Sequence, residues 1–288
     1  MPKLLLLFTV FLLMTAVCAG GRETGSPALI PPSALASQEA AAEPAPKPSP
    51  PANKTTGRTD NTGKTKRSRT LTLAQLHRKY PQLLILNGNP LVRQAALTFD
   101  DAPDNKYTPR VLDVLREHHV QATFFVVGWR AEKYPDVIRR MVREGHIIGN
   151  HSYSHADLSR LSDTRFQTEI RQTEMVIHHL TGYTPKLVRP PYGSIKEHQL
   201  LWLESRNSLV TNWNVDSLDW RGLKAPQVTR NVLSTMKPGA IILQHSSGGR
   251  GIDMTGTVQA LPTIITKLQG EGYELVTLPE LLHISKSK

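Results

Sequence analysis

The distribution of apolar residues divides the chain into three parts. Residues 4–17 form an uncharged apolar run, and residues 21–70 contain almost no large apolar side chain. From residue 71 onward, short β-rich runs alternate with longer segments of helical period. We therefore predict an N-terminal segment over 1–20, a disordered linker over 21–70 and one folded domain over 71–288.

Seven short apolar runs in the folded part predict strands. They cover residues 95–99, 122–127, 147–149, 187–189, 209–212, 240–243 and 274–277. Helices are predicted over 71–80, 109–118, 135–143, 163–180, 195–206, 226–236, 257–269 and 279–284. This alternation predicts an α/β fold with a parallel sheet, closed as a barrel with one strand fewer than the common eight. An open doubly wound sheet is the alternative, but no glycine-rich phosphate turn follows the first strand.

The apolar run at the N-terminus bears on where the protein acts. It follows Lys3 and is shorter than the roughly 20 apolar residues that a membrane span requires, so we interpret it as a secretory signal. An uncleaved membrane anchor is the alternative. Cys18 is the only cysteine, which excludes an intramolecular disulfide and leaves lipidation of that residue as a further alternative. We expect an exported protein, either secreted or associated with the cell envelope.

The positive charge of the chain is not concentrated in one part. Of the formal net charge of +11, residues 1–70 carry +5 and residues 71–288 carry +6. No recognition motif accompanies this charge, so nucleic acid is not an expected partner. The basic linker favours association with an anionic envelope polymer or membrane surface, with a solvated surface as the alternative. We expect a monomer.

Polar residues suited to catalysis follow the predicted strands. They are Asp100 and Asp101 after the first strand, His151 and His155 after the third, Arg189 at the end of the fourth, Asp216 and Asp219 past the fifth, and His245 after the sixth. The carboxyl ends of parallel strands form one face of a barrel, and active sites are built there. We therefore expect these five groups to converge at one site.

The aspartate pair and the histidine pair together predict a divalent-metal site. Two histidines and a carboxylate can hold such a metal with one position open for water, whose pKa the metal lowers. If the strand geometry continues through Asp100 and Asp101, they point to opposite sides, so that one can bind metal while the other takes a proton. His151 and His155 lie four residues apart, so a helical turn would direct both rings the same way. Helix capping is the alternative role of the aspartates.

The remaining polar residues predict the surroundings of this metal. Arg189 begins a rigid turn with two prolines and could hold a neighbouring carboxylate ionised, and the amide of Tyr192 could stabilise an oxyanion. A carboxylate at position 216 or 219 would raise the pKa of His245 and keep it protonated as a general acid. Trp220 could line the pocket or stack on a sugar.

Two tryptophans and one loop complete the expectations from the residues. We assign Trp202 and Trp213 to the core. Residues 246–251 contain serine and glycine and predict a flexible loop over the same face, where it could cover a substrate.

Together these residues resemble the polysaccharide deacetylase family (carbohydrate esterase family 4, the NodB-homology domain), whose members use a metal to remove N-acetyl groups from sugar polymers. The five motifs of that family appear in order at 98–101, 151–155, 189–193, 216–220 and 243–245, and the resemblance spans about 93–282. One position departs from the family pattern, because Ala102 stands where glycine usually follows the second aspartate. A positive φ at that position would strain the turn.

The resemblance implies a distorted (β/α)7 barrel, a catalytic domain over 71–288 and a role for each motif residue. Asp100 would be the general base, positioned by Arg189, and the metal ligands would be Asp101, His151 and His155. His245 would be the general acid, tuned by Asp216 or Asp219. The Tyr192 amide would donate to the oxyanion, and Leu243 would form part of the acetyl pocket. Zinc is the first expectation for the metal, with cobalt and nickel as alternatives.

The implied reaction is direct attack of water on an N-acetyl group, which releases acetate without a covalent enzyme intermediate. Peptidoglycan is the first expected substrate of an exported enzyme, and chitin oligomers or an exopolysaccharide come next. Two other functions stay open. One is an envelope glycan-binding module without turnover, and the other is deacylation of a small non-sugar amide, which a narrow, closed pocket would favour.

Overall fold

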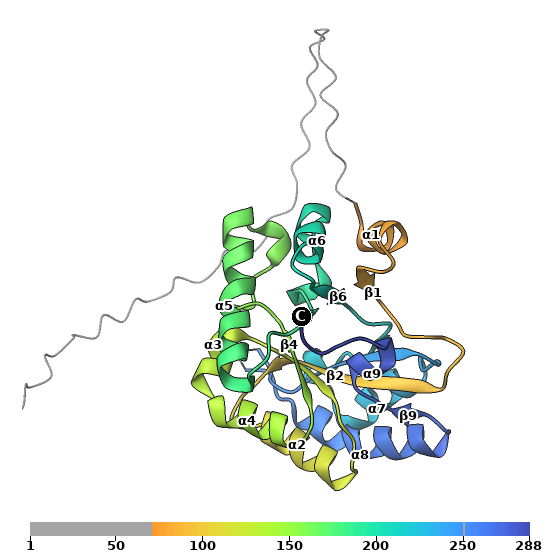
Figure 1. Cartoon of the computed structure of the whole chain (residues 1–288). Helices are drawn as coiled ribbons and strands as arrows, with labels where there is room; N and C mark the ends of the chain where they lie inside the picture. Colours follow the sequence, from red (N-terminus) through yellow and green to blue (C-terminus); the bar gives the residue numbers. More distant parts are fainter. Residues whose placement is uncertain (1–70, 250) are drawn as a thin grey trace, which may run out of the picture. The chain divides into compact units, whose positions relative to one another are not determined.

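A parallel sheet of nine strands forms the centre of the part that the computed structural model describes, residues 71–249 and 251–288 (Figure 1). The strands are β1 (Leu84–Ile85), β2 (Gln94–Ala102), β3 (Thr123–Val126), β4 (Ile147–Asn150), β5 (Leu187–Val188), β6 (Leu209–Thr211), β7 (Val215–Asp216), β8 (Ala240–His245) and β9 (Glu274–Leu275). Their order is β1-β6-β5-β4-β3-β2-β8-β7, with β9 beside β2. The predicted signal segment, Cys18 and the linker lie outside the described residues.

The predicted parallel α/β fold is confirmed, but its sheet is a half-barrel, because the end strands β1 and β7 do not pair with each other. All seven predicted strands are present, and every strand pair is parallel. The strands β1 and β7 extend the sheet at its two ends and were not expected. Each contains only two residues, which is too short to produce a recognisable strand period.

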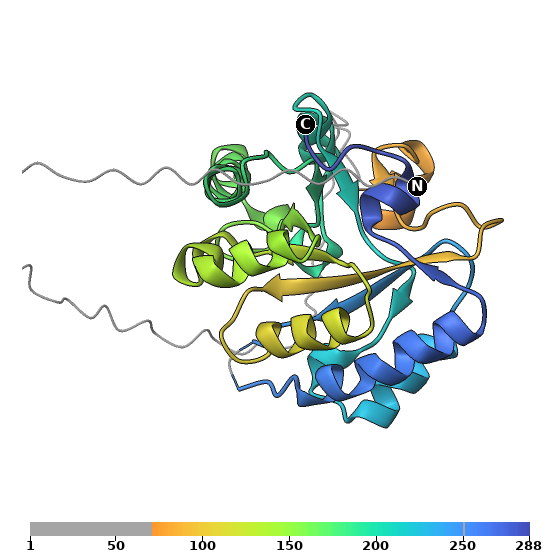
Figure 2. The same ribbon diagram turned by 60° about the horizontal axis from the view of Figure 1, so that its bottom comes forward.

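Helices cover the outer side of the sheet, and Figure 2 shows α2, α7 and α8 next to one another below it. The helices are α1 (Leu73–Lys79), α2 (Thr108–Glu117), α3 (Gly128–Lys133), α4 (Pro135–Arg143), α5 (Asp163–Thr181), α6 (Glu197–Glu204), α7 (Ala225–Leu233), α8 (Thr255–Gly270) and α9 (Leu278–Leu282). All eight predicted helices are present. Helix α3 was not predicted, because its six residues are too few to establish a helical period.

Local sequence signals set several helix boundaries. The carboxylate of Asp104 accepts hydrogen bonds from the N–H groups of residues 106–108 and so caps the start of α2. The hydroxyl of Ser162 accepts from the N–H of Arg165 at the start of α5, and Gly182, with φ 78°, ends that helix. Pro135 occupies the first position of α4, where a missing N–H costs nothing.

Strand β2 runs through the centre of the sheet and separates the core from the site. Its residues Leu97 and Phe99 belong to the core between sheet and helices, where the Phe99 ring stacks on Phe124 at a centroid distance of 5.1 Å. Because side chains alternate along a strand, Thr98 and Asp100 face the opposite, inner side. The apolar positions of β2 therefore direct its polar positions into the barrel.

Within residues 71–249 and 251–288, no helix has both the length and the apolar character needed to cross a lipid bilayer.

Candidate active site

The carboxyl ends of the strands surround a pocket of about 410 Å³. It is lined by Asp100, Asp101, His151, His155, Tyr192, Trp213, Asp216, Trp220, Leu243 and His245. Nine of these residues are ones that the sequence analysis selects. Trp213 is the tenth: it packs against a hydrophobic core cluster, as predicted, and it also forms part of the pocket wall. The other two selected residues, Arg189 and Asp219, are buried behind the wall and bonded to residues in it.

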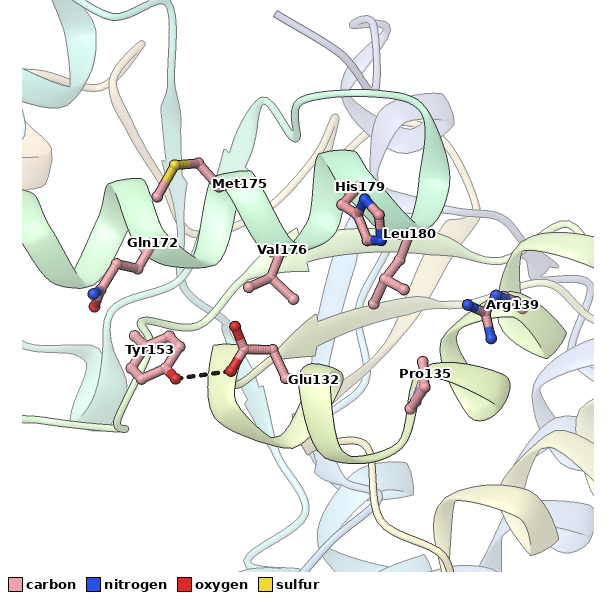
Figure 3. Close-up of a pocket in the computed structure, with 9 residues that line it drawn as sticks. All are labelled: Glu132, Pro135, Arg139, Tyr153, Gln172, Met175, Val176, His179 and Leu180. Atoms are coloured by element: carbon pink, nitrogen blue, oxygen red, sulfur yellow. Dashed lines mark hydrogen bonds between the residues drawn. The ribbon is translucent and has the colours of Figure 1, made fainter. Parts of the chain in front are cut away.

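A second hollow, of about 540 Å³, lies between α5 and the helices α3 and α4 (Figure 3). Its walls combine apolar side chains of α5 with a few polar ones, and the hydroxyl of Tyr153 donates to Glu132 there at 2.8 Å. Among the described residues, the one group of side chains suited to hold a metal lies in the smaller pocket instead. The smaller pocket is therefore the candidate active site.

The aspartate pair does not follow regular strand geometry. The register of β2 against β3 shifts between Phe99 and Ala102, and Asp101 has a left-handed backbone with φ 63°. As a result both carboxylates approach Nε2 of His151, with Asp100 Oδ2 at 3.7 Å and Asp101 Oδ1 at 3.6 Å. Regular strand geometry, the condition under which the two side chains would point to opposite sides, does not hold here, because the bulge turns Asp101 back towards the pocket.

Ala102 fits its position without strain. Its φ is not positive, and its side chain is buried in the core between sheet and helices. The left-handed conformation falls on Asp101 instead, a residue type that tolerates it better than most. Alanine in place of the family's usual glycine is therefore compatible with this backbone.

The histidine pair lies on an irregular loop after β4. Ser152 and His155 have φ values of 64° and 60°, so the predicted helical turn is not formed. The two rings nevertheless meet, with 5.1 Å between the centroids of His151 and His155. Left-handed backbone turns in this loop therefore bring the two histidine rings together, as a helical turn was expected to do.

Glu169 of α5 holds this loop from behind. Its Oε2 atom accepts from the N–H groups of Tyr153 and Ser154 at 2.9 and 2.7 Å, and its Oε1 atom accepts from the Ser154 hydroxyl at 2.7 Å. Both bonded residues lie between the two histidines. The sequence analysis missed Glu169, because a polar residue on an amphipathic helix carries no local sign of such a contact.

Asp101, His151 and His155 are arranged to hold a divalent metal. One ligand atom from each lies within 4.8 Å of the other two. Nδ1 of His151 is bonded to the carbonyl oxygen of Arg189 at 2.7 Å, which leaves Nε2 for the pocket. Oδ1 of Asp101 is buried and has no hydrogen bond of acceptable geometry among the described residues, although Nε2 of His155 lies 3.0 Å away. Lone pairs that converge in this way fit a bound cation.

The charges in the pocket favour the ligand forms of these side chains. Burial alone would raise the pKa of Asp101, but His155, His151 and His245 outweigh burial and hold that pKa well below its usual range. Burial lowers the pKa of His151, against the opposing effect of Asp100 and Asp101. An ionised carboxylate and a neutral imidazole are the protonation states that bind a metal.

Arg189 is fully buried and bonded to the other aspartate. Its Nη1 atom donates to Oδ1 of Asp100 and to the hydroxyl of Thr98, both at 2.8 Å. The remaining bonds go to the carbonyl oxygens of Thr211 and Asn212 at 3.0 and 3.1 Å. Its guanidinium carbon lies 4.1 Å from the centre of the Phe125 ring. This arrangement fixes Asp100 while its Oδ2 atom faces His151.

On the opposite side of the pocket, Asp219 is the partner of His245. Oδ1 of Asp219 lies 2.7 Å from Nδ1 of His245, and Oδ2 accepts from the His245 N–H and the Thr257 hydroxyl, both at 2.8 Å. Burial alone would lower the pKa of His245, but Asp219 raises it to about 9. Asp216 accepts from the N–H of Leu218 instead and lines the pocket. The sequence left open whether Asp216 or Asp219 is the partner of His245, and the contacts identify Asp219.

The rim of the pocket carries two exposed aromatic side chains. Tyr192 is 68% exposed and Trp220 is 46% exposed. Tyr192 has a left-handed backbone, with φ 60°, and its ring lies edge-on to His155 at 5.1 Å. Leu243 is buried within the pocket wall. Leu243 therefore supplies an apolar contact inside the pocket, and Tyr192 and Trp220 supply aromatic surfaces that are open to solvent.

Sequence comparison places residues 87–207 in a family model described as polysaccharide deacetylase. A peptidoglycan-N-acetylglucosamine deacetylase of Bacillus cereus is 45% identical over 195 residues, which is 68% of this chain and 70% of the relative. The peptidoglycan-N-acetylglucosamine deacetylase PgdA of Listeria monocytogenes is 39% identical over 189 residues. That alignment covers 66% of this chain and 39% of PgdA, so this chain spans well under half the length of that relative.

Structural comparison gives the same result. The crystal structure of the Bc1960 peptidoglycan N-acetylglucosamine deacetylase superimposes with a TM-score of 0.70 and 43% sequence identity. The match covers 71% of this chain and 95% of that structure. The resemblance noted from the motifs is thus confirmed for both sequence and fold.

Loss of Arg189 is expected to leave the buried carboxylate of Asp100 without its cation. We expect Arg189→Met to lower the free energy of unfolding by about 3–5 kcal/mol, measured by urea denaturation. Arg139→Met removes an exposed ion pair with Asp136 and is the matched control, with an expected change below about 1 kcal/mol.

The double variant Arg189→Met/Asp100→Asn tests the cause of this loss. It removes both charges, so we expect part of the stability lost in Arg189→Met to return. Losses that simply add would contradict the view that the unpaired charge of Asp100 is responsible.

Loss of Glu169 is expected to loosen the loop that carries both histidines. We expect Glu169→Ala to weaken zinc affinity by about 10- to 100-fold, as measured by competition with a chromogenic chelator. Glu169→Gln keeps one acceptor oxygen and should lose less. Glu132→Ala removes only the bond to the Tyr153 hydroxyl and is the control. Equal zinc affinities of Glu169→Ala and Glu132→Ala would contradict the role of Glu169.

Proposed function

This chain belongs to the polysaccharide deacetylase family, and we propose that it is a metal-dependent N-deacetylase that acts on peptidoglycan. One observation carries the proposal. A single pocket brings together a His/His/Asp ligand set, a carboxylate held by a buried arginine and an imidazole held by a buried aspartate. Hydrolysis of an amide requires a base, an acid and stabilisation of an oxyanion, and these groups would provide all three.

Asp101, His151 and His155 would hold the metal, with zinc as the first candidate and cobalt or nickel as alternatives. A divalent metal at this position supplies Lewis acidity to the carbonyl group and lowers the pKa of water. The donor set of two imidazoles and one carboxylate is typical of catalytic zinc sites. Asp101 lies in β2 and both histidines lie on one loop after β4, so the geometry of the ligand set depends on Glu169 and Arg189, which hold that loop.

Asp100 would act as the general base. Arg189 binds its Oδ1 atom, so the Oδ2 atom is left on the pocket side to accept a proton from the attacking water. His245 would act as the general acid towards the leaving amine, because Asp219 occupies Nδ1 and favours the protonated ring. The amide of Tyr192 would donate to the oxyanion, and Leu243 would contact the methyl group of the acetyl substrate.

Two features support a sugar polymer over a small non-sugar amide. Tyr192 and Trp220 stand exposed at the opening of the pocket, where aromatic rings can stack on the apolar faces of sugars. The relatives described above are named for their action on peptidoglycan N-acetylglucosamine. Chitin oligomers and an exopolysaccharide are the alternative substrates that the tests below separate.

We propose that the protein acts as a monomer outside the cytoplasm, at the cell envelope. The apolar run at 4–17 supports export, and a peptidoglycan substrate lies on that side of the membrane. The basic residues of the segment 54–69 would add an electrostatic attraction to anionic envelope polymers or to the membrane surface.

Acetate release tests the proposed activity. The purified protein is incubated with peptidoglycan, N-acetylglucosamine oligomers and a small acetyl amide, with and without a chelator. We expect release from peptidoglycan that the chelator abolishes and added zinc restores, and at least a 100-fold lower rate for Asp100→Asn, since about that factor is supplied by general base catalysis. Glycan binding that persists in Asp100→Asn, with no acetate released by the native protein, would instead identify a glycan-binding module.

The pH dependence tests the role of His245. A general acid must be protonated, so kcat/KM is expected to fall on the alkaline side as His245 loses its proton. Asp100 and Asp101 contribute to the raised pKa of His245, and a bound cation would offset their negative charge. The fall in kcat/KM is therefore expected at or below pH 9, the pKa of His245 without the cation being about 9.

Two aspartate variants separate the residues that could influence that pKa. Asp219→Asn removes the charge bonded to His245, and we expect the alkaline limb of the pH profile to move down by about one pH unit or more. Asp216→Asn is the matched control, and its alkaline limb should stay within about half a pH unit of the native one. The same displacement in both variants would contradict the assignment of Asp219.

A further inference from the structure

The exposed aromatic side chains of the described residues all follow strands at the pocket face. Trp129, Tyr192 and Trp220 are 40%, 68% and 46% exposed. Each lies three or four residues after the end of a strand: Trp129 after β3, Tyr192 after β5 and Trp220 after β7. Single exposed apolar residues are common, but three large aromatic rings restricted to one face indicate a binding surface. Tyr192 and Trp220 belong to the pocket, whereas Trp129 lies outside its lining.

Trp129 adjoins both metal-binding segments. Its backbone N–H donates to the carbonyl oxygen of Tyr153 at 3.1 Å, and Tyr153 belongs to the loop that carries His151 and His155. The centre of its ring lies 5.3 Å from the guanidinium carbon of Arg130. Arg130 in turn donates to the carbonyl oxygen of Asp101 at 3.0 Å. The indole is therefore linked through one hydrogen-bonding side chain to the backbone of the aspartate in the metal site.

Arg130 also joins Trp129 to the loop that follows β8. Its guanidinium donates to the hydroxyl of Ser247 and, at 3.3 Å, to the carbonyl oxygen of Gly248. All of these bonds are to protein groups, so they hold Arg130 in place beneath the indole ring. Trp129 thus stands between two loops of the catalytic face, over a side chain that is hydrogen-bonded to β2 and to the loop after β8, which suits a surface on which a ligand stacks.

Lys133 supplies a charge next to this ring. It lies one helical turn after Trp129 on α3, and its Nζ atom is 6.0 Å from the centre of the Trp129 ring and 5.3 Å from that of Tyr134. Lys133 is exposed and makes no ion pair with a carboxylate of the described residues. The neighbouring Glu132 does not pair with Lys133: it points into the hollow beside α5, where it accepts a hydrogen bond from the hydroxyl of Tyr153 (Figure 3).

We propose that Trp129 and Lys133 form a second sugar-binding site, which takes a carboxylate-bearing unit of the polysaccharide next to the unit in the pocket. The indole would stack on the apolar face of the sugar ring, and the ammonium group would pair with the carboxylate. The proposal rests on the proposed function and narrows its substrate. Peptidoglycan carries a lactyl carboxylate, or the peptide attached to it, on alternate sugars, whereas chitin has no carboxylate.

Binding of two soluble tetrasaccharides tests this proposal. One is the neutral tetramer of N-acetylglucosamine, and the other is a peptidoglycan fragment of the same length with free lactyl carboxylates. Affinities are measured by isothermal titration calorimetry with chelator-treated protein, so that neither ligand is consumed. Acetate release by untreated protein is measured on the same fragments. A lack of turnover would then count against the proposed function without obscuring the binding result.

The two variants have different expected effects. Trp129→Ala should weaken binding of both tetramers by about five- to tenfold, because stacking does not depend on charge. Lys133→Gln should weaken only the carboxylate-bearing tetramer, by about two- to fivefold, and this difference should disappear in high salt.

Matched controls lie elsewhere on the surface. Leu201→Ala removes an apolar side chain of α6 that is 38% exposed, and Lys286→Gln removes a lysine whose Nζ atom lies 5.0 Å from the centre of the Tyr183 ring. Both should bind the two tetramers as the native protein does. An affinity of Trp129→Ala equal to that of Leu201→Ala would overturn the proposal. An equal effect of Lys133→Gln on the neutral and the charged tetramer would overturn it as well.

Discussion

The buried guanidinium of Arg189 is the constraint on which the rest of the site depends. A permanent cation removed from water must find a partner for nearly every N–H group, or its burial costs several kcal/mol. Arg189 meets this condition by bonding to Thr98 and Asp100 of β2 and to the carbonyl groups that end β6. Its own carbonyl oxygen is bonded to His151. The side chain of Arg189 therefore ties β2 to β6 and orients the base, while the main-chain carbonyl of the same residue orients a metal ligand.

Left-handed backbone conformations of non-glycine residues are concentrated at the pocket face. Eight non-glycine residues of the described part have a positive φ, and five of them lie at or just after the carboxyl ends of strands that form the pocket face: Asp101, Ser152, His155, Tyr192 and Leu218. Such conformations persist only where the surrounding structure holds them. Glu169 holds the histidine loop from behind, and Arg130 bonds to the carbonyl oxygen of Asp101. The strained turns bring groups into the pocket that regular strands and helices would direct elsewhere.

The same framework gives the ionisable groups of the pocket different protonation states. Asp101 keeps its charge because imidazoles surround it, and His151 stays neutral because it is buried between strands. His245 has the opposite tendency, because Asp219 lies directly behind it. Groups that favour different protonation states in one pocket are what acid–base catalysis of amide hydrolysis requires. The pKa of Asp101 is thus lowered by other residues of the lining, whereas the pKa of His245 is raised chiefly by a buried partner behind the pocket wall.

The parallel α/β fold and most residues of the pocket can be predicted from the sequence, because strand periods and polar groups at strand ends are local patterns. Tertiary structure alone decided how these residues meet. It turned Asp101 towards His151 by a bulge, selected Asp219 over Asp216 as the partner of His245, and gave Trp213 a place in the pocket wall in addition to its core contact. It also brought Glu169 to the histidine loop. A left-handed φ and a buried partner depend on packing between distant segments, and periodicity and motif order carry no record of that packing.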